Sequence, residues 1–410
     1  MPNRSGITPE FIRRIPKTDL HLHLDGSLRI ATLIELARSD RVPLPSTEET
    51  GLKELVFKET YANLSEYLCG FKYTCAVLQR AEHLERVAYE LALDNLAEGV
   101  RYIEVRFAPQ LHLHEGLGIR DVLAAVCRGL DRAKLEHHRE AEANPDDLPF
   151  EYGIIVCAMR SFHAAMSPYY RNLLGTLQTT PRKEVFAIAS LEMARAAVEV
   201  RDETGLPIVG FDLAGEESGY PAGDHRAAYQ YAHSHFLKKT VHAGEAYGPE
   251  SIFQAITDCH ANRIGHGTFL FASERICDAT IPSPIKYVEQ LADYIASQRI
   301  TVEVCLTSNL QTTPALQSVP DHPLLRMIDH ELSVSLCTDN RLISNTSVCR
   351  ELQLATNHLP ITRRQFRNLI LAGFKGSFYS DFYAKKRTYV RRAIELYERL
   401  ESRLLLPHPS

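Results

Sequence analysis

The chain has 410 residues, of which 45% are hydrophobic and 24% charged, values typical of a globular protein that buries a sizeable core. Its 46 lysines and arginines stand against 51 aspartates and glutamates, so the formal net charge is −5, which gives no reason to expect nucleic acid or an anionic membrane as a partner. No apolar run approaches the roughly 20 residues that span a bilayer, and the polar segment 1–14 has no apolar signal core, so we expect a cytoplasmic protein.

Short β-rich runs alternate with longer helical stretches along the chain. The predicted strands are Thr18–Leu24, Tyr102–Pro109, Phe150–Met159, Ile208–Gly215, Lys238–Gly244, Arg263–Phe269, Ile300–Asn309 and Ser333–Asn340. Between them, amphipathic stretches such as Ala81–Glu98 and Glu184–Glu203 predict helices. This alternation predicts an α/β fold, a (β/α)₈ TIM-type barrel with helical insertions. An open doubly wound sheet is the alternative, but no glycine-rich phosphate turn follows the first strand.

A large insertion is expected between the first two strands. A barrel needs roughly 250 residues, so about 150 must lie in insertions and termini. We expect a single domain over residues 1–410, with a helical lid insertion around 26–99. Within it, residues 63–71 carry apolar side chains at helical spacing, which fits either a lid over the site or ordinary packing. The charged stretch Glu136–Leu148 is expected to be an excursion on the surface.

Polar and ionisable residues gather where several of the predicted strands end. They are His21, His23 and Asp25 on or after the first strand, Asp212 and Gly215 on the fourth, His242 and Glu245 on or after the fifth, His266 on the sixth, and Asp339 and Asn340 on the eighth. A barrel brings the carboxyl ends of its strands to one face, where active sites of this fold are built. His21 and His23 point to the same side because alternate residues of a strand share a face.

Two imidazoles from the first strand, a third from His242 and the carboxylate of Asp339 could surround one divalent ion. Nitrogen-rich ligation with one carboxylate suits zinc best, with iron and manganese as alternatives. The nine cysteines stand singly and form no CxxC pair, which argues against a disulfide framework and against a thiolate zinc site.

Two further HxH pairs occur in the sequence. His233 and His235 fall in a predicted helix, where residues two apart do not share a face, so we interpret them as structural. His112 and His114 follow the second strand on the active face, where a role in substrate binding or in the loop itself stays open.

The same residues carry a resemblance to a known family. The adenosine deaminases, a branch of the metal-dependent amidohydrolases, have an N-terminal signature that PKTDLHLHLDGSL resembles. GFDLAGEE, VHAGE, RIGHG, CLTSN and the Thr338-Asp339 pair are also similar to motifs of that family, so the resemblance runs from about Pro16 to Arg341. It implies one Zn²⁺ per subunit, held by His21, His23, His242 and Asp339. It further implies hydrolytic deamination of adenosine or 2′-deoxyadenosine to the inosine nucleoside and ammonia.

The resemblance also implies roles in catalysis and in substrate binding. Glu245 would protonate N1 of the purine while a metal-activated water adds to C6, and His266 would orient that water and stabilise its charge. The contacts to a small-molecule purine nucleoside would come from His23, Asp25, Gly215 and Asn340. In the family the aspartate after HxH binds the ribose hydroxyls, and the glycine of LAG donates its N–H to N3. For Gly215, a tight turn after the strand is the alternative reading.

Asn340 departs from the family pattern, in which a second aspartate follows the metal-binding one and contacts N7. An asparagine amide donates a hydrogen bond at any working pH, so it is compatible with the N7 acceptor. The preferred aminopurine stays open among adenosine, adenine and a 5′-modified adenosine, as does the oligomeric state. An inactive metal-binding paralogue is a further alternative, although no expected ligand is missing and Glu245 is present.

Two other metal-dependent classes fit less well. Binuclear amidohydrolases usually need a bridging lysine at the end of the fourth strand, which here ends with Leu213, Ala214 and Gly215. Cytidine deaminases use HxE with PCxxC, and neither motif occurs.

Overall fold

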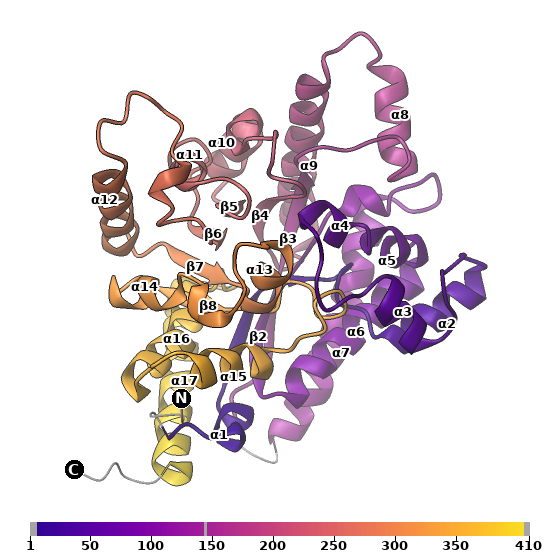
Figure 1. The fold of residues 1–410 in the computed structure, drawn as a ribbon. Helices are drawn as coiled ribbons and strands as arrows, with labels where there is room; N and C mark the ends of the chain where they lie inside the picture. The colour runs from indigo at the N-terminus through magenta and orange to yellow at the C-terminus, as the bar shows by residue number, and fades with distance from the viewer. Residues whose placement is uncertain (1–5, 143–145, 406–410) are drawn as a thin grey trace.

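The structure is a computed structural model that describes residues 6–142 and 146–405, and its centre is an eight-stranded parallel sheet (Figure 1). The strands pair in chain order and are β1 (Lys17–His23), β2 (Val100–Phe107), β3 (Glu151–Met159), β4 (Ile208–Ala214), β5 (Lys238–Ala243), β6 (Arg263–His266), β7 (Thr301–Val304) and β8 (Val334–Leu336). A parallel bridge between Leu22 and Asp339 joins β1 to the segment after β8 and closes the ring. The expected (β/α)₈ TIM-type barrel is confirmed.

Helices cover the barrel and form the insertion between β1 and β2 (Figure 1). After α1 (Pro9–Arg14), the segment between these strands forms α2 (Ile30–Asp40), α3 (Glu49–Leu55), α4 (Leu64–Leu68), α5 (Phe71–Val77) and α6 (Ala81–Ala97). The later helices are α7 (Ile119–Glu142), α8 (Pro168–Thr176), α9 (Arg182–Thr204), α10 (Arg226–Ser234), α11 (Pro249–Thr257), α12 (Pro284–Ser297), α13 (Leu306–Thr312), α14 (Leu324–Asp329), α15 (Val348–His358), α16 (Arg363–Gly376) and α17 (Tyr383–Leu404). The short helices α2 to α5 lie together on one side of the barrel.

All eight predicted strands exist, but the last ones are shorter than expected. The prediction Ile300–Asn309 was wrong beyond residue 304, because helix α13 begins at Leu306. The predicted excursion over 136–148 was also partly wrong, since α7 continues to Glu142 and residues 143–145 lie outside the described residues. Charged residues occupy the exposed face of such a helix as readily as a loop, so composition alone did not separate the two.

Polar side chains line the interior of the barrel, as strand β1 shows. Every residue of β1 is buried, and its leucines alternate with Asp19, His21 and His23. Leu20 and Leu22 belong to the apolar core, so the alternation places the polar set on the barrel's inner side. Buried charges of this kind are stable only when they are paired, which the site below shows in detail.

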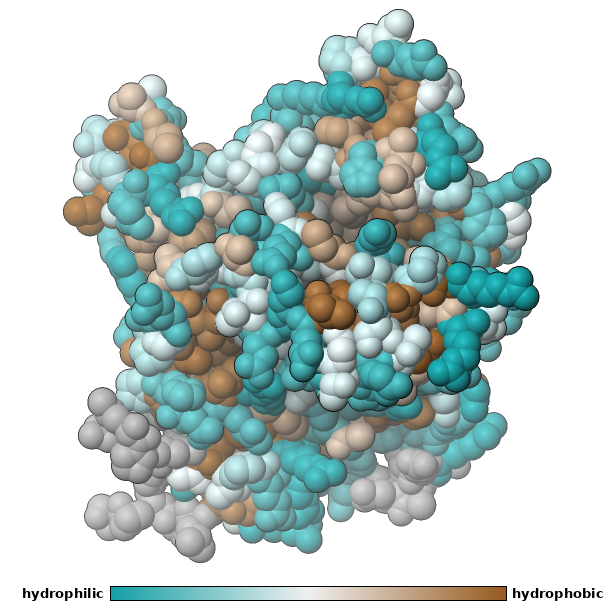
Figure 2. Space-filling view, turned by 45° about the vertical axis from the view of Figure 1, so that its right-hand side comes forward, coloured by the Kyte–Doolittle hydropathy of each residue, from teal (hydrophilic) through white to brown (hydrophobic). Residues whose placement is uncertain are grey.

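Among the described residues, no helix is both long enough and apolar enough to cross a bilayer. Hydrophilic side chains cover most of the face seen in Figure 2, and the hydrophobic ones form separate patches on it.

Candidate active site

The four side chains expected around a metal lie together at the carboxyl end of the barrel. Nε2 of His242 is 3.0 Å from Nε2 of His21 and 3.2 Å from Nε2 of His23. Oδ1 of Asp339 is 3.5 Å from Nε2 of both His21 and His23. All four residues are buried, so four polar atoms converge on one point that is shielded from solvent.

Hydrogen bonds on the far side of two imidazoles determine which nitrogen faces this point. Nδ1 of His21 lies 2.9 Å from a carboxylate oxygen of Glu303, and Nδ1 of His242 lies 3.1 Å from one of Asp212. A carboxylate only accepts hydrogen bonds, so each Nδ1 carries the proton and each Nε2 presents a lone pair. Carboxylates commonly fix metal-binding histidines in this way.

This donor set fits a zinc ion. Two lone pairs 3.0 Å apart repel each other unless a cation lies between them. Three nitrogens bound to one zinc at about 2.0–2.1 Å are roughly 3.3 Å apart in a tetrahedral arrangement, close to the separations found. His21, His23, His242 and Asp339 are therefore the residues that would hold the ion, as the sequence predicts.

His266 also lies close to this cluster, but a chain of hydrogen bonds makes it a donor. The N–H of Leu324 donates to Nδ1 of His322 (3.1 Å), so the proton of His322 is on Nε2, which donates to Oδ1 of Asn309 (3.2 Å). The amide nitrogen of Asn309 then donates to Nδ1 of His266 (3.0 Å). The remaining proton of His266 is on Nε2, which lies 3.7 Å from a carboxylate oxygen of Glu245.

Distance alone would place His266 among the metal ligands. Its ligand atom and those of His21, His242 and Asp339 all lie within 4.8 Å of one another. A proton on Nε2 leaves no lone pair to bind a metal, so this hydrogen-bond chain favours His23 over His266 as the third imidazole that would hold the ion. Burial lowers the pKa of His266 well below its usual range, which keeps the ring neutral.

Asp339 is held by neighbours that sequence reasoning missed. Its Oδ2 accepts a hydrogen bond of 2.6 Å from the hydroxyl of Ser308. The preceding residue, Thr338, donates from its N–H (3.2 Å) and its hydroxyl (2.5 Å) to the carboxylate of Asp19. Ser308 lies in the motif CLTSN and Asp19 lies in the motif PKTDLHLHLDGSL. Membership of these motifs is the sequence signal that could have pointed to them.

Glu245 lies in the turn after β5, three residues beyond His242. Its side chain is buried, and burial raises its pKa to about 8. A carboxyl group with such a pKa is mostly protonated at neutral pH and can donate a proton, which is the property that a general acid needs.

Glu217 fixes the turn that carries Glu245, and sequence reasoning gave it no role. Its carboxylate accepts hydrogen bonds from the N–H groups of Gly244 (2.9 Å), Glu245 (2.9 Å), Ala246 (2.6 Å) and Tyr247 (3.0 Å) and from the hydroxyl of Ser251. These donors lie 27 to 34 residues further along the chain, so the sequence hides the contact. Glu217 is fully buried, so water does not readily replace its carboxylate as the acceptor for these N–H groups.

Two of the expected substrate contacts have unusual environments. Asp25 is buried, its pKa is raised to about 7 by that burial, and its Oδ1 has no hydrogen-bond partner among the described residues. Gly215 has φ +97°, and a Cβ there would lie 3.2 Å from Cε of Met159. A side chain at this position would be strained, so glycine allows the main chain after β4 to turn here.

Asn340 is buried between the turn after β8 and the insertion. Its amide nitrogen donates a hydrogen bond of 2.9 Å to the hydroxyl of Tyr67, which lies 2.7 Å from the hydroxyl of Ser344. Its Oδ1 has no partner in the part of the chain that the structure describes. A Cβ on Gly26 would overlap this oxygen at 1.8 Å, so Gly26 leaves the room that Asn340 occupies.

The residues expected to form a lid lie over the cluster. The ring of Phe71 is 6.4 Å from that of His23 in an edge-on arrangement. Ser65 donates a hydrogen bond of 2.9 Å to Glu216, in the loop after β4. The insertion therefore reaches across the carboxyl face of the barrel and contacts the loop on the other side.

The other two HxH pairs make structural contacts. Nδ1 of His112 is 2.9 Å from the carbonyl of Leu78, and Nε2 of His114 is 3.0 Å from the carbonyl of Gln79, so this pair ties the insertion to the segment after β2. His233 and His235 lie at the end of α10, where their Nδ1 atoms contact Lys239 (3.2 Å) and the carbonyl of Tyr231 (2.8 Å).

Comparison with known proteins gives the family. A model of the adenosine deaminase family matches residues 16–179 and 173–392. The chain belongs to the adenosine deaminase family. It is 38% identical to the adenosine deaminase of Mycobacterium leprae over 349 residues, 84% of each chain. It is 33% identical to a probable adenosine deaminase of Dictyostelium discoideum over 377 residues, which are 92% of this chain but 42% of that longer one. Like other adenosine deaminase family members, it is a hydrolase that acts on carbon–nitrogen bonds.

Solved structures with the same fold include members with different substrates. An amidohydrolase from Burkholderia ambifaria with bound zinc is 19% identical and has a TM-score of 0.75, with 98% of this chain and 97% of that one covered. Adenine deaminase from Arthrobacter aurescens is 20% identical (TM-score 0.71, coverage 94% and 99%). The N6-methyl-AMP deaminase of Arabidopsis thaliana is 24% identical (TM-score 0.70, coverage 95% and 98%). At these identities the likeness shows the fold alone.

Chelation should remove activity from this adenosine deaminase family member. We expect that a strong chelator abolishes ammonia release, that added zinc restores it, and that metal analysis finds close to one zinc per chain, because one set of four ligands converges here. His242→Ala should lose most of the zinc, whereas His235→Ala, a histidine outside the cluster, should keep it. Two equivalents of metal per chain would contradict the mononuclear site.

Glu217→Gln should lower turnover while the protein keeps its zinc. The amide cannot accept hydrogen bonds through its nitrogen, so we expect the turn that carries Glu245 to shift. Misplacement of a catalytic group by about 1 Å lowers the rate on the order of 10²-fold. The measurements are kcat and KM for ammonia release together with zinc content and thermal unfolding. We expect the loss in kcat, with KM and zinc content changed much less. The exposed Glu274→Gln is the matched control, and a Glu217→Gln enzyme with ordinary kcat would remove Glu217 from positioning.

Proposed function

We propose that this protein deaminates adenosine and 2′-deoxyadenosine to inosine and 2′-deoxyinosine, releasing ammonia with the use of one zinc ion. The observation that carries the proposal is the convergence of three imidazole Nε2 atoms and Asp339 beside a buried Glu245 at the carboxyl face of the barrel. Its identity of 32% to 38% with adenosine deaminases over most of the chain supports the substrate class.

The protein's own groups handle the protons of this reaction. When bound, zinc supplies a water that is nucleophilic at neutral pH. Addition of that water at C6 interrupts the aromatic ring and leaves N1 in need of a proton, which Glu245 donates. The N–H of His266 stabilises the negative charge on the attacking oxygen. One water is consumed: as the C6–N bond breaks, one of its protons leaves with the amino group as ammonia, the other restores Glu245, and the 6-oxo purine remains.

The nucleoside is held by groups that have hydrogen-bonding capacity to spare. The unpartnered carboxylate oxygen of Asp25 fits a ribose hydroxyl, which would satisfy it. Gly215 would offer its main-chain N–H to N3. Asn340 uses its amide nitrogen for Tyr67, and the second hydrogen on that nitrogen is available to N7.

The alternatives are the free base and the nucleotide, which adenine deaminase and N6-methyl-AMP deaminase of the same fold would suggest. Adenine would leave Asp25 without a partner in a buried site, and unpaired buried polar groups are costly. The phosphate of a nucleotide would meet the negative charge of Asp25 when that group is ionised. Both arguments favour the nucleoside.

A panel of aminopurines should therefore rank adenosine and 2′-deoxyadenosine first. We expect kcat/KM for adenosine to exceed that for AMP and for adenine by roughly 10²-fold or more, because a site built around polar groups rejects analogues that leave them unpaired. Ammonia release measures each rate. Asp25→Asn should narrow the ratio between adenosine and AMP, and comparable kcat/KM values for the two in the native enzyme would refute the nucleoside assignment.

Glu245→Gln should keep zinc and still bind nucleoside but lose turnover. General acid catalysis contributes roughly 10²–10⁴-fold, so kcat should decrease by a factor in that range or larger, since the amide has no proton to give. Zinc analysis and equilibrium binding of inosine separate this effect from a loss of the site. Near-native kcat in Glu245→Gln would exclude it as the proton donor.

A further inference from the structure

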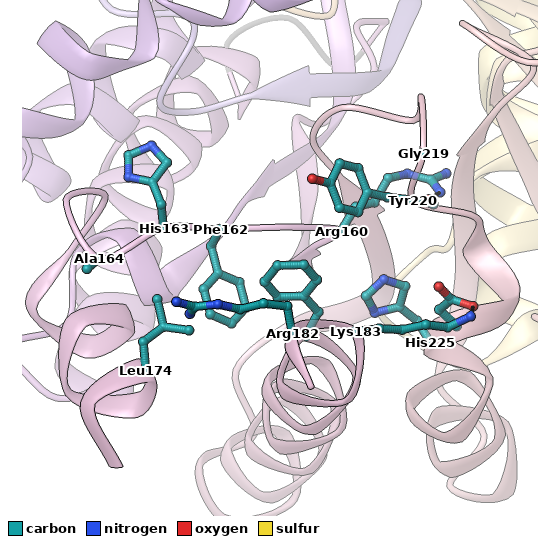
Figure 3. Close-up of a pocket in the computed structure, with 12 residues that line it drawn as sticks. Arg160, Phe162, His163, Ala164, Leu174, Arg182, Lys183, Gly219, Tyr220 and His225 are labelled. Atoms are coloured by element: carbon teal, nitrogen blue, oxygen red, sulfur yellow. Dashed lines mark hydrogen bonds and ion pairs between the residues drawn. The ribbon is translucent and has the colours of Figure 1, made fainter. Parts of the chain in front are cut away.

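A second pocket lies beside the barrel, separate from the metal cluster. Its volume is about 530 Å³, and α8, the first turn of α9, the loop after β3 and the loop after β4 form its walls (Figure 3). Pockets that take small molecules have volumes of roughly 300–1,000 Å³. None of the residues assigned above to the metal, to proton transfer or to substrate binding lines this pocket.

Aromatic side chains form one wall of the pocket. The ring of Phe186 lies edge-on to that of Phe162, with centroids 4.8 Å apart, and edge-on to that of Tyr220 at 5.9 Å. Phe162 and Phe186 both line the pocket. Edge-on pairs of this kind present the environment that a further aromatic ring prefers.

Cationic side chains also line the pocket. The guanidinium of Arg182 lies at the exposed rim and makes no ion pair or hydrogen bond with any other described residue. Lys183 is paired with Asp224 at 2.7 Å, so these two cancel. His225 is uncharged, because burial lowers its pKa to about 3. The pocket therefore keeps a positive charge although the whole chain has a net charge of −5.

Arg160 adds a buried positive charge to the same pocket. Its side chain is fully buried, and its two terminal nitrogens donate to the carbonyl oxygens of Tyr220 and His242. Its Nε has no hydrogen-bond partner within residues 6–142 and 146–405, and no carboxylate pairs with the guanidinium there. A buried donor without a partner is costly, and an acceptor in the pocket would satisfy it.

The first turn of α9 points to the same kind of ligand. This helix of 23 residues begins at the pocket, and its N-cap, Pro181, makes no side-chain cap hydrogen bond. The N–H groups of such a first turn and the helix dipole attract a negative group. The N-terminus of α9, the exposed Arg182 and the buried, unpartnered Nε of Arg160 each favour an acceptor in this pocket.

We propose that this pocket binds a small aromatic molecule that carries one acidic group, a carboxylate or a phosphate. The ring packs against Phe162 and Phe186, and the acidic group contacts Arg182 and the N-terminus of α9. This site is additional to the deaminase site and does not depend on the function proposed for it.

Titration calorimetry with phenyl phosphate and benzoate tests the proposal on the zinc-loaded protein. Saturating inosine is present throughout, so that the deaminase site is filled. We expect about one equivalent of at least one probe to bind, and the probe that binds more tightly identifies the acidic group. Benzyl alcohol, which has the ring without the charge, and inorganic phosphate, which has the charge without the ring, should each bind at least about tenfold more weakly.

Two variants and a control locate the binding. Arg182→Glu should weaken binding of the charged probe at least about tenfold, because it reverses the charge at the rim. Phe186→Leu should weaken the aromatic probe and leave inorganic phosphate unchanged. Arg171→Glu makes the same charge change at an exposed residue of α8 outside the pocket and should have little effect. Absence of binding by both probes in the presence of inosine, or an equal loss in Arg171→Glu, would overturn the proposal.

Discussion

The metal cluster depends on Arg106, a cation buried in the middle of the barrel. Its guanidinium donates to Asp212 and Glu303 at 2.8 Å each, and these two carboxylates accept from His242 and His21. Without Arg106, Asp212 would lie in a buried environment without a cationic partner, which costs several kcal/mol, and Glu303 would keep only its ion pair with Arg263. Protonation would relieve that cost, but a protonated carboxyl would no longer hold the imidazoles with Nε2 free. The charge of Arg106 therefore sets the tautomers on which metal binding depends.

The same network leaves a net negative charge that one divalent cation would balance. Arg263 pairs with Glu303 and Glu104, so the centre of the barrel holds three carboxylates against two guanidiniums, and Asp339 adds one more negative charge at the top. A single divalent cation balances the remainder. The backbone is strained at the same place: His266 and Asp339 have φ of +65° and +60°, which costs a non-glycine residue of order 1–3 kcal/mol. The bridge between β1 and the segment after β8 holds Asp339 in that conformation.

Sequence reasoning succeeded where a local pattern is tied to the barrel's geometry. The convergence of His21 and Asp339, which lie 3.5 Å apart, could be predicted because polar residues at strand ends stand out against apolar runs and a barrel brings strand ends together. Sequence reasoning failed at Leu306, where a helix begins within an apolar run that has no signal to separate it from the strand before it. Arg106 and Glu217 were also missed. Their partners lie on other strands and turns, and the local sequence around a charged residue does not show which distant group it pairs with.

The loop after β4 joins the two sites of the molecule. Glu217 of this loop accepts a hydrogen bond from the N–H of Glu245 in the catalytic turn. Three residues later, the carbonyl of Tyr220 accepts a hydrogen bond from Arg160, which also donates to the carbonyl of His242. One guanidinium, that of Arg160, thus contacts both the wall of the second pocket and the main chain of His242. A change in the position of Arg160 must alter a hydrogen bond at His242, because the same rigid group makes both contacts. The shape of this loop therefore constrains the catalytic turn and the second pocket together.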